Sequence, residues 1–179
     1  MLNGIDSSLS FNSWASPLLH EHKIPHWFSK RDPPDSNWIA RRLGSQNAHS
    51  ARVKQVHGAK CVDAAECESD PLQLADAIIT NDPLLVPIIS TADCCPVLVA
   101  CLHSKSCAAI HAGWRGIALD IVGESLRALV ERFGADPKHM VAAIGPCASV
   151  ERYEVGEDVM NAFTQRGLNA LGQLAKATA

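Results

Sequence analysis

Short, almost continuous apolar runs are the clearest pattern in the sequence, and they predict buried β-strands. Residues 96–102 and 107–111 are two such runs, and the short polar stretch between them predicts a hairpin. A turn signal, Asn81-Asp82-Pro83, separates two further runs. These two runs, 77–80 and 85–90, are predicted to be strands, and so are residues 61–65 and 140–144. The strand at 140–144 is also expected to be buried.

Helical periodicity is strongest at residues 116–133, which predict one long helix. Gly134 stands where a C-cap glycine belongs, and Asp136-Pro137 is a stop signal. Shorter helices are predicted at 36–43 and 156–165. The long helix carries one apolar stripe, formed by Leu119, Val122, Leu126, Leu129, Val130 and Phe133.

The first part of the chain has little periodicity. Residues 1–50 hold three of the four tryptophans and a Pro-Pro pair. We expect an irregular N-terminal segment here, within the same domain as residues 51–179. A chain of 179 residues is long enough to bury one sizeable core.

Composition narrows the class of protein. The formal net charge of −3 gives no sign of the basic surface that nucleic-acid-binding proteins carry. The longest apolar runs are too short for a membrane span, and the polar N-terminus does not resemble a secretory signal. Seven cysteines, an odd number lying mostly in apolar stretches, favour free thiols or metal ligands in a reducing cytosol. We therefore expect a cytoplasmic protein.

Three motifs at strand ends carry candidate chemistry: residues 54–58, 91–96 and 111–116. They contain His57, Cys94 and His111. Two imidazoles and one thiolate leave a fourth tetrahedral position open, which is typical of catalytic zinc. The three residues are far apart in the sequence, so only the fold can bring them together. Around one ion, their donor atoms should converge within about 4 Å.

Each of these residues also has a structural interpretation. A histidine beside glycine at a strand end is often hydrogen-bonded without a metal, and a cysteine before an apolar strand is often inert core. Asp93 either orients a ligand or bonds local amides. The remaining candidates have alternatives too: Asp76 as a cap or turn former, Trp114 as core, and Tyr153 as a pocket edge or helix lead-in.

The motifs occur in an order that resembles the laccase-domain family, the YfiH-like proteins also called multicopper polyphenol oxidase-like. The resemblance covers residues 53–156. It rests on Gln55-Val56-His57-Gly58, Ala75-Asp76-Ala77-Ile78-Ile79-Thr80, Thr91-Ala92-Asp93-Cys94-Cys95-Pro96-Val97-Leu98, His111-Ala112-Gly113-Trp114-Arg115-Gly116, Ile144-Gly145-Pro146 and Tyr153-Glu154-Val155-Gly156.

The resemblance implies an α/β fold, a layered sandwich of mixed β-sheet flanked by helices. It also implies zinc, with copper as the alternative metal, held by His57, Cys94 and His111. Cys95 occupies the variable position of the Cys-x-Pro motif, so the donor is assigned to Cys94. The family's C-terminal Cys-Thr and aromatic Ser-Tyr-Arg-Arg-like elements have no counterpart here, and we expect a domain that is incomplete at its C-terminus.

The activity implied by the resemblance is zinc-dependent phosphorolysis of adenosine, inosine and methylthioadenosine, with adenosine deamination beside it. Phosphate would be held by Arg115, by the amides after Gly113 and by Lys54. The catalytic residues would be Cys94, His111, Asp93 and Arg115. Purine nucleosides and phosphate are then the partners of a monomer or homodimer.

Three other functions compete with this prediction. The protein could be a zinc-binding but inactive remnant that acts as a partner protein. It could be a thiol hydrolase with Cys94 as nucleophile and His111 as base. A copper-dependent polyphenol oxidase ranks last, because one His-Cys-His set lacks the many histidines of a multicopper centre.

Overall fold

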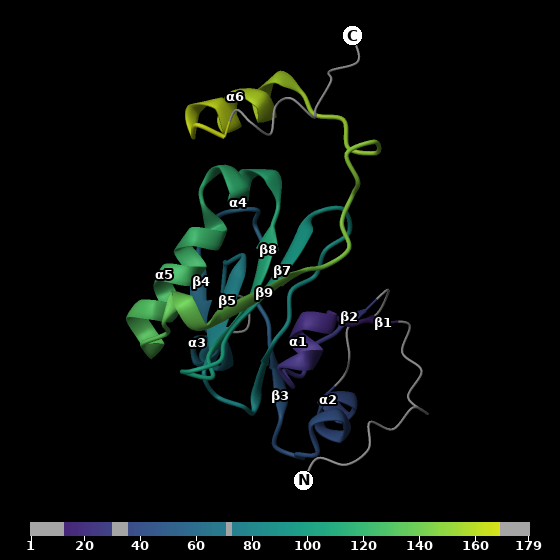
Figure 1. The fold of residues 1–179 in the computed structure, drawn as a ribbon, viewed down its shortest axis with the longest axis vertical. Coiled ribbons are helices and arrows are strands. Elements are labelled where there is room, and N and C mark those ends of the chain that lie inside the picture. The colour runs from purple at the N-terminus through teal and green to yellow at the C-terminus, as the bar shows by residue number, and fades with distance from the viewer. Residues whose placement is uncertain (1–12, 30–35, 71–72, 169–179) are drawn as a thin grey trace.

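The structure, a computed structural model, describes residues 13–29, 36–70 and 73–168. A five-stranded sheet forms its centre, in the order β4-β5-β8-β7-β9 (Figure 1). Its strands are β4 (Cys61–Asp63), β5 (Ala77–Thr80), β7 (Cys95–Cys101), β8 (Cys107–Ala112) and β9 (Met140–Ile144). β4 and β5 are parallel and the other pairs antiparallel, so the sheet is mixed as predicted.

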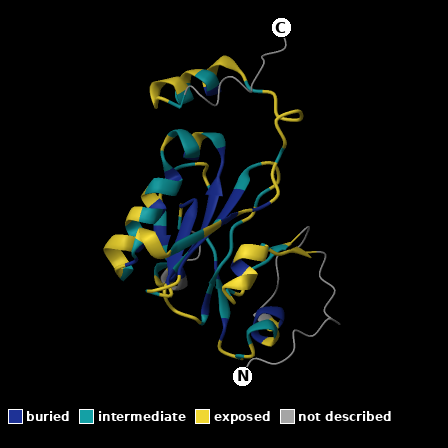
Figure 2. Cartoon of the chain, in the orientation of Figure 1, coloured by how far each residue is buried: buried dark blue, intermediate teal, exposed yellow. Residues whose placement is uncertain are grey.

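One face of the sheet is covered by the helix α5 (Ile121–Phe133), which follows α4 (Trp114–Ala118). Ile110 of β8 and Leu129 of α5 are fully buried in this layer. The inner strands are buried while the outer surface of α5 is exposed (Figure 2). Gly134 ends α5 in the left-handed conformation, with φ of +62°, and confirms the predicted C-cap.

We expect Leu129→Ala to lower the free energy of unfolding by about 3–5 kcal/mol, because it removes a fully buried side chain and leaves a cavity in this layer. Chemical denaturation of the metal-free protein measures the effect. Val130→Ala on the same helix is the control, since Val130 is 38% exposed and should cost less than about 1 kcal/mol. Equal losses for the two variants would contradict the packing described.

On the other side of the central sheet lie the short N-terminal elements (Figure 1). They are β1 (Ser13–Trp14), α1 (Pro17–Glu21), β2 (Phe28–Ser29), α2 (Ser36–Leu43) and β3 (His49–Ala51). β1 pairs with β2, and β3 pairs in parallel with β6 (Leu85–Pro87). The helix at 36–43 is confirmed. An irregular segment was expected for residues 1–50, but β1, α1, β2 and β3 lie in its described part. These elements were not predicted because two to five residues are too few to show a period.

The predicted long helix at 116–133 is wrong in one respect, since it is two helices. Asp120 breaks it with φ of +66°, a conformation that aspartate tolerates better than most residues. Its carboxylate pairs with Arg127 at 2.9 Å. The break turns Leu119 to solvent, where it is 54% exposed, so the apolar stripe begins after it.

Other element boundaries also differ from expectation. The strand predicted at 61–65 ends at Asp63, whose carboxylate accepts the N–H of Ala65 and caps α3 (Ala64–Ser69). The strand predicted at 85–90 ends at Pro87. β9 has the predicted bounds but is an edge strand, not a buried one, and Ile144 is 71% exposed.

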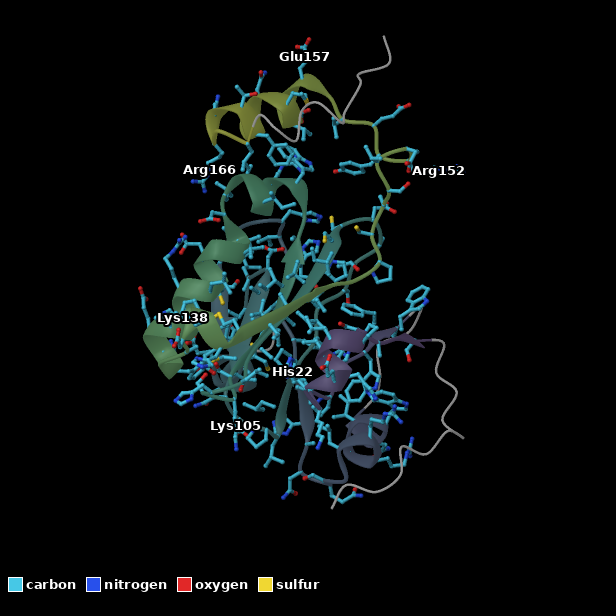
Figure 3. The ribbon with its side chains drawn as sticks, viewed as in Figure 1. His22, Lys105, Lys138, Arg152, Glu157 and Arg166 are labelled. Carbon is cyan, nitrogen blue, oxygen red and sulfur yellow. The ribbon has the colours of Figure 1, made fainter. Side chains whose placement is uncertain are left out.

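The last described helix, α6 (Glu157–Gln165), lies beyond α4 and confirms the helix predicted at 156–165, with Gly156 as its N-cap. Arg166 lies between the two helices, where its guanidinium donates to the C=O of Ala118 (Figure 3). Glu157 points outward from the far side of α6 (Figure 3). A short 3-10 turn, Pro137–His139, precedes β9. Among the described residues, no helix is long and apolar enough to cross a membrane.

Candidate metal centre

The fold brings the three predicted donors together. One donor atom each from His57, Cys94 and His111 lies within 4.8 Å of the others, slightly wider than the spread of about 4 Å expected around one ion. His57 is exposed, Cys94 half-buried and His111 buried. The two imidazole rings meet edge to face at 4.7 Å between centroids. This cluster could hold a metal ion while keeping one side open to solvent.

The loop that carries His57 is shaped by a buried carboxylate. His57 adopts φ of +61°, an uncommon conformation for a residue with a side chain. The curl directs successive N–H groups toward Asp76, whose oxygens accept from His57 at 2.8 Å and from Gly58 at 2.7 Å. The N–H of Val56 also points at this carboxylate, at 3.2 Å. Such a concave set of amides binds an anion, here one supplied by the protein itself.

The same carboxylate orients the second histidine. His111 Nδ1 lies 2.8 Å from Asp76 Oδ1, and both side chains are buried. With Nδ1 donating to the carboxylate, Nε2 is the nitrogen left to face a metal. Burial alone would raise the pKa of Asp76, but the hydrogen bonds from His111 and the three amides outweigh it and hold that pKa below its usual value.

A second connection holds the His57 loop against the Cys94 loop. The side-chain amide of Gln55 donates to the C=O of Ser90 at 2.7 Å and accepts its N–H at 2.7 Å. The Gln55 side chain thus makes the two hydrogen bonds that a neighbouring strand would make to Ser90. Gln55 lies two residues before His57, and Ser90 lies four residues before Cys94. Sequence reasoning used Gln55 only as part of a motif and did not assign it this role.

Glycine is needed where the donors converge. A Cβ on Gly113 would lie 3.0 Å from His57 Cδ2 and 3.2 Å from Cys94 Sγ. Three residues on, a Cβ on Gly116 would lie 2.8 Å from the C=O of Gly58, so α4 packs directly on the His57 loop. The sequence analysis placed Gly113 beside the amides expected to hold phosphate. The structure adds that the backbone at Gly113 lies close to His57 and Cys94, where a side chain would not fit without a shift.

We expect Gly113→Ala to weaken zinc binding by about tenfold, since the new methyl group would crowd His57 and Cys94 and each would have to shift by a few tenths of an ångström. Competition with a chromophoric chelator measures the dissociation constant. Gly58→Ala is the matched control, because the nearest atom to its added Cβ is 3.6 Å away. Unchanged zinc affinity in Gly113→Ala would show that the donors do not meet at an ion there.

The electrostatics of Cys94 do not match those of an activated thiol nucleophile. Burial, together with the negative charges of Asp93 and Asp76, raises the pKa of Cys94 above its ordinary value. A nucleophilic cysteine needs the opposite shift. The same two carboxylates favour a cation next to the thiol.

Asp93 itself is exposed, and its backbone carbonyl oxygen accepts the N–H of Ala148 at 3.1 Å. Among the described residues its carboxylate makes no hydrogen bond to either histidine. The contact that orients a donor histidine belongs to Asp76, which the sequence analysis treated as a cap or turn former. A carboxylate directly before a fully buried strand was the signal available.

Arg115 is exposed at the start of α4, with its guanidinium carbon 4.2 Å from the ring centroid of Trp114. No carboxylate lies within ion-pair distance of it in the described part of the protein. Lys54 is exposed as well, and its backbone pairs with residues 73–75. Tyr153 is close enough to the site for Cys94, Arg115 and Asp93 to influence its pKa, which burial chiefly raises.

A separate cavity of about 670 Å³ lies between the N-terminal elements and the sheet. Trp27, Phe28 and Trp38 line it together with Asp93, but none of the three donors does. It therefore borders the candidate metal centre without containing it.

Proteins with similar sequences include two purine nucleoside phosphorylases. The chain is 42% identical over 121 residues to a purine nucleoside phosphorylase of Bacteroides thetaiotaomicron, covering 68% of this chain and 45% of that protein. A purine nucleoside phosphorylase of Deinococcus radiodurans is 38% identical over 130 residues, or 73% of this chain and 50% of that one. The chain thus spans about half the length of the relatives it matches.

Solved structures share the fold. A DUF152-family protein of Neisseria meningitidis superposes with a TM-score of 0.65 at 31% identity, covering 75% of this chain and 52% of that one. YlmD of Geobacillus stearothermophilus gives 0.63 at 23% identity, over 73% and 51%. The family model described as multi-copper polyphenol oxidoreductase laccase matches residues 35–178. The chain therefore belongs to the laccase-like family of that description.

Proposed function

We propose that this protein holds a zinc ion through His57, Cys94 and His111 and takes part in phosphorolysis of purine nucleosides, with adenosine, inosine and methylthioadenosine as substrates. The observation that carries the proposal is the convergence of three donors around an open side, with one histidine oriented by Asp76. The names of the two relatives give the reaction class.

The residues present suit zinc. Two imidazoles and one thiol are donors that zinc accepts readily, and the copper alternative has no larger histidine set near it in the described residues. Zinc held by three protein donors would supply Lewis-acid polarisation of a substrate atom. Asp76 fixes the proton of His111 on Nδ1, so the other nitrogen presents a lone pair.

Phosphorolysis also needs an anion site next to the sugar. Arg115 meets this need because it is exposed, free of a carboxylate partner among the described residues, and held over the ring of Trp114. Its planar fork can bind two phosphate oxygens. Lys54 is a weaker candidate that would act as a point charge.

The test uses the full-length protein, with zinc measured by elemental analysis. It is incubated with adenosine and phosphate, and the products are separated by chromatography. Adenine and ribose 1-phosphate that form only when phosphate is present support the proposal. Inosine and ammonia would indicate deamination, the second activity. Zinc bound without turnover of any nucleoside would contradict the catalytic proposal and favour an inactive zinc-binding protein.

The predicted cytoplasmic location and monomeric or dimeric state remain proposals. All seven cysteines are free thiols, which agrees with a reducing compartment.

A further inference from the structure

The segment that leads to Cys94 leaves the sheet before it reaches the candidate metal centre. The parallel pairing of β3 with β6 ends at Ala51 and Pro87. One further bond of the same kind follows, in which the N–H of Ile88 donates to the C=O of Ala51 at 2.9 Å. Residues 88–94 belong to no strand. The place of the Cys94 sulfur therefore depends on the contacts that hold this segment.

The side chain of Gln55 makes the next connection to this segment. Gln55 Nε2 donates to the C=O of Ser90 at 2.7 Å, and Gln55 Oε1 accepts the N–H of Ser90 at 2.7 Å. A carboxamide carries the donor and the acceptor of a peptide group, so one side chain satisfies both backbone groups of Ser90. The side chain thus continues the pairing of β3 and β6 beyond its last backbone bond.

The backbone of Gln55 is itself held on both sides. Before it, Lys54 pairs with residues 73–75 through backbone hydrogen bonds of 2.9 and 3.3 Å. After it, the N–H of Val56 points at the buried carboxylate of Asp76, at 3.2 Å. The side chain of Gln55 therefore extends from a fixed backbone, and it can hold the neighbouring segment in place.

On the basis of the zinc binding proposed above, we propose that Gln55 is a positioning residue of the candidate metal centre. It contributes no donor atom to the cluster of His57, Cys94 and His111. Its side chain instead fixes Ser90, four residues before the thiol, while its own backbone leads into the His57 loop. Gln55 thus sets the separation of two donors that come from different loops.

Both halves of the carboxamide are needed for this role. In Gln55→Glu the carboxylate can still accept the N–H of Ser90, but it places an acceptor against the C=O of that residue. Gln55→Met keeps the length of the side chain and lacks both groups. Ser90 is exposed, so water can satisfy its backbone groups in either variant and the protein should stay folded. The loss should therefore fall on the alignment of the donors.

Metal titrations of the full-length protein test the proposal. Competition with a chromophoric chelator should show zinc binding weakened about tenfold in Gln55→Glu and in Gln55→Met, the lower end of the range for a residue that orients a metal donor. Co²⁺ binds the same kinds of donor, and its thiolate charge-transfer absorption reports contact with sulfur. At saturating Co²⁺ this absorption should be weaker or shifted in both variants. Gln165→Glu, the same substitution at an exposed position on α6, is the control and should match the wild-type protein.

Hydrogen exchange of the metal-free protein tests the contact itself. The backbone N–H of Ser90 is bonded to Gln55 Oε1, so a peptide that covers residues 88–94 should exchange faster in Gln55→Met than in the wild-type protein. The midpoint of metal-free denaturation should change little, because the lost bonds lie at an exposed residue.

Three results would overturn the proposal, and they separate it from the proposed function. If the wild-type protein binds zinc and both Gln55 variants bind it equally well, the role of Gln55 fails while the metal centre stands. If the variants lose metal-free stability in proportion to zinc affinity, Gln55 supports the fold rather than the centre. If the wild-type protein binds no zinc at all, the proposed function fails and the role of Gln55 fails with it.

Discussion

Cys94→Ser is expected to lose bound zinc during dialysis, whereas the wild-type protein is expected to retain about one ion per molecule. The substitution removes one of three converging donors. The loss of affinity should exceed the roughly 10–100-fold that follows removal of an outer hydrogen-bonding partner. Elemental analysis gives the zinc content, and added zinc should partly restore the proposed phosphorolysis.

Cys95→Ser is the matched control for this prediction. It removes a neighbouring thiol that does not belong to the donor cluster, so it should retain zinc. If Cys94→Ser retained zinc tightly and yet lost all turnover, the thiol would be a nucleophile rather than a metal donor. The raised pKa of Cys94 argues against that outcome.

Asp76→Asn is expected to affect folding and zinc binding together. An asparagine amide would put a donor where the carboxylate accepts hydrogen bonds from the His57 loop and from His111. Disrupting such a buried charged network costs about 3–5 kcal/mol of unfolding free energy. Zinc affinity should fall about 10–100-fold. Chemical denaturation in the presence of a chelator and a zinc competition titration measure the two effects separately.

The control for Asp76→Asn is Asp93→Asn. It removes the same charge near the same thiol, but from an exposed position with no hydrogen bond to a histidine in the described structure. Equal effects of the two substitutions would mean that charge alone matters. The lowered pKa of Asp76 adds a pH signature: its contribution to stability is present above about pH 4 and is lost as the pH falls through its folded value. Asp76→Asn should lack this acid sensitivity.

Strands were predictable where apolar residues follow one another without interruption. β5 and β9 have the predicted bounds, and the β7–β8 hairpin is as expected. The edge position of β9 was not predictable, because a run of small and apolar residues looks the same in either place. The helix break at Asp120 was not predicted for a related reason. The apolar period continues across residue 120, and only the positive φ of Asp120 reveals the break.

The convergence of His57, Cys94 and His111 was predictable through their motifs, but the contacts that support them were not. Asp76 binds backbone N–H groups, which almost every residue carries, so no pattern of residue types identifies its partners. The positive φ of His57, which directs those N–H groups toward Asp76, cannot be recognised from the sequence either. Gln55 acts on the backbone of Ser90 in the same way. Residue types could thus predict which side chains come together, whereas the backbone groups that align them could not be recognised from the sequence.

The three donors come from segments that meet only after the central sheet has assembled. Under the proposed zinc binding, the complete donor set exists only in the folded protein, and the ion should bind the native state in strong preference to the unfolded one. By mass action such a ligand adds about 2.7 kcal/mol to stability at a hundred times its dissociation constant. If zinc fills the centre as proposed, the thermal tolerance of this protein should follow the zinc supply of the cell.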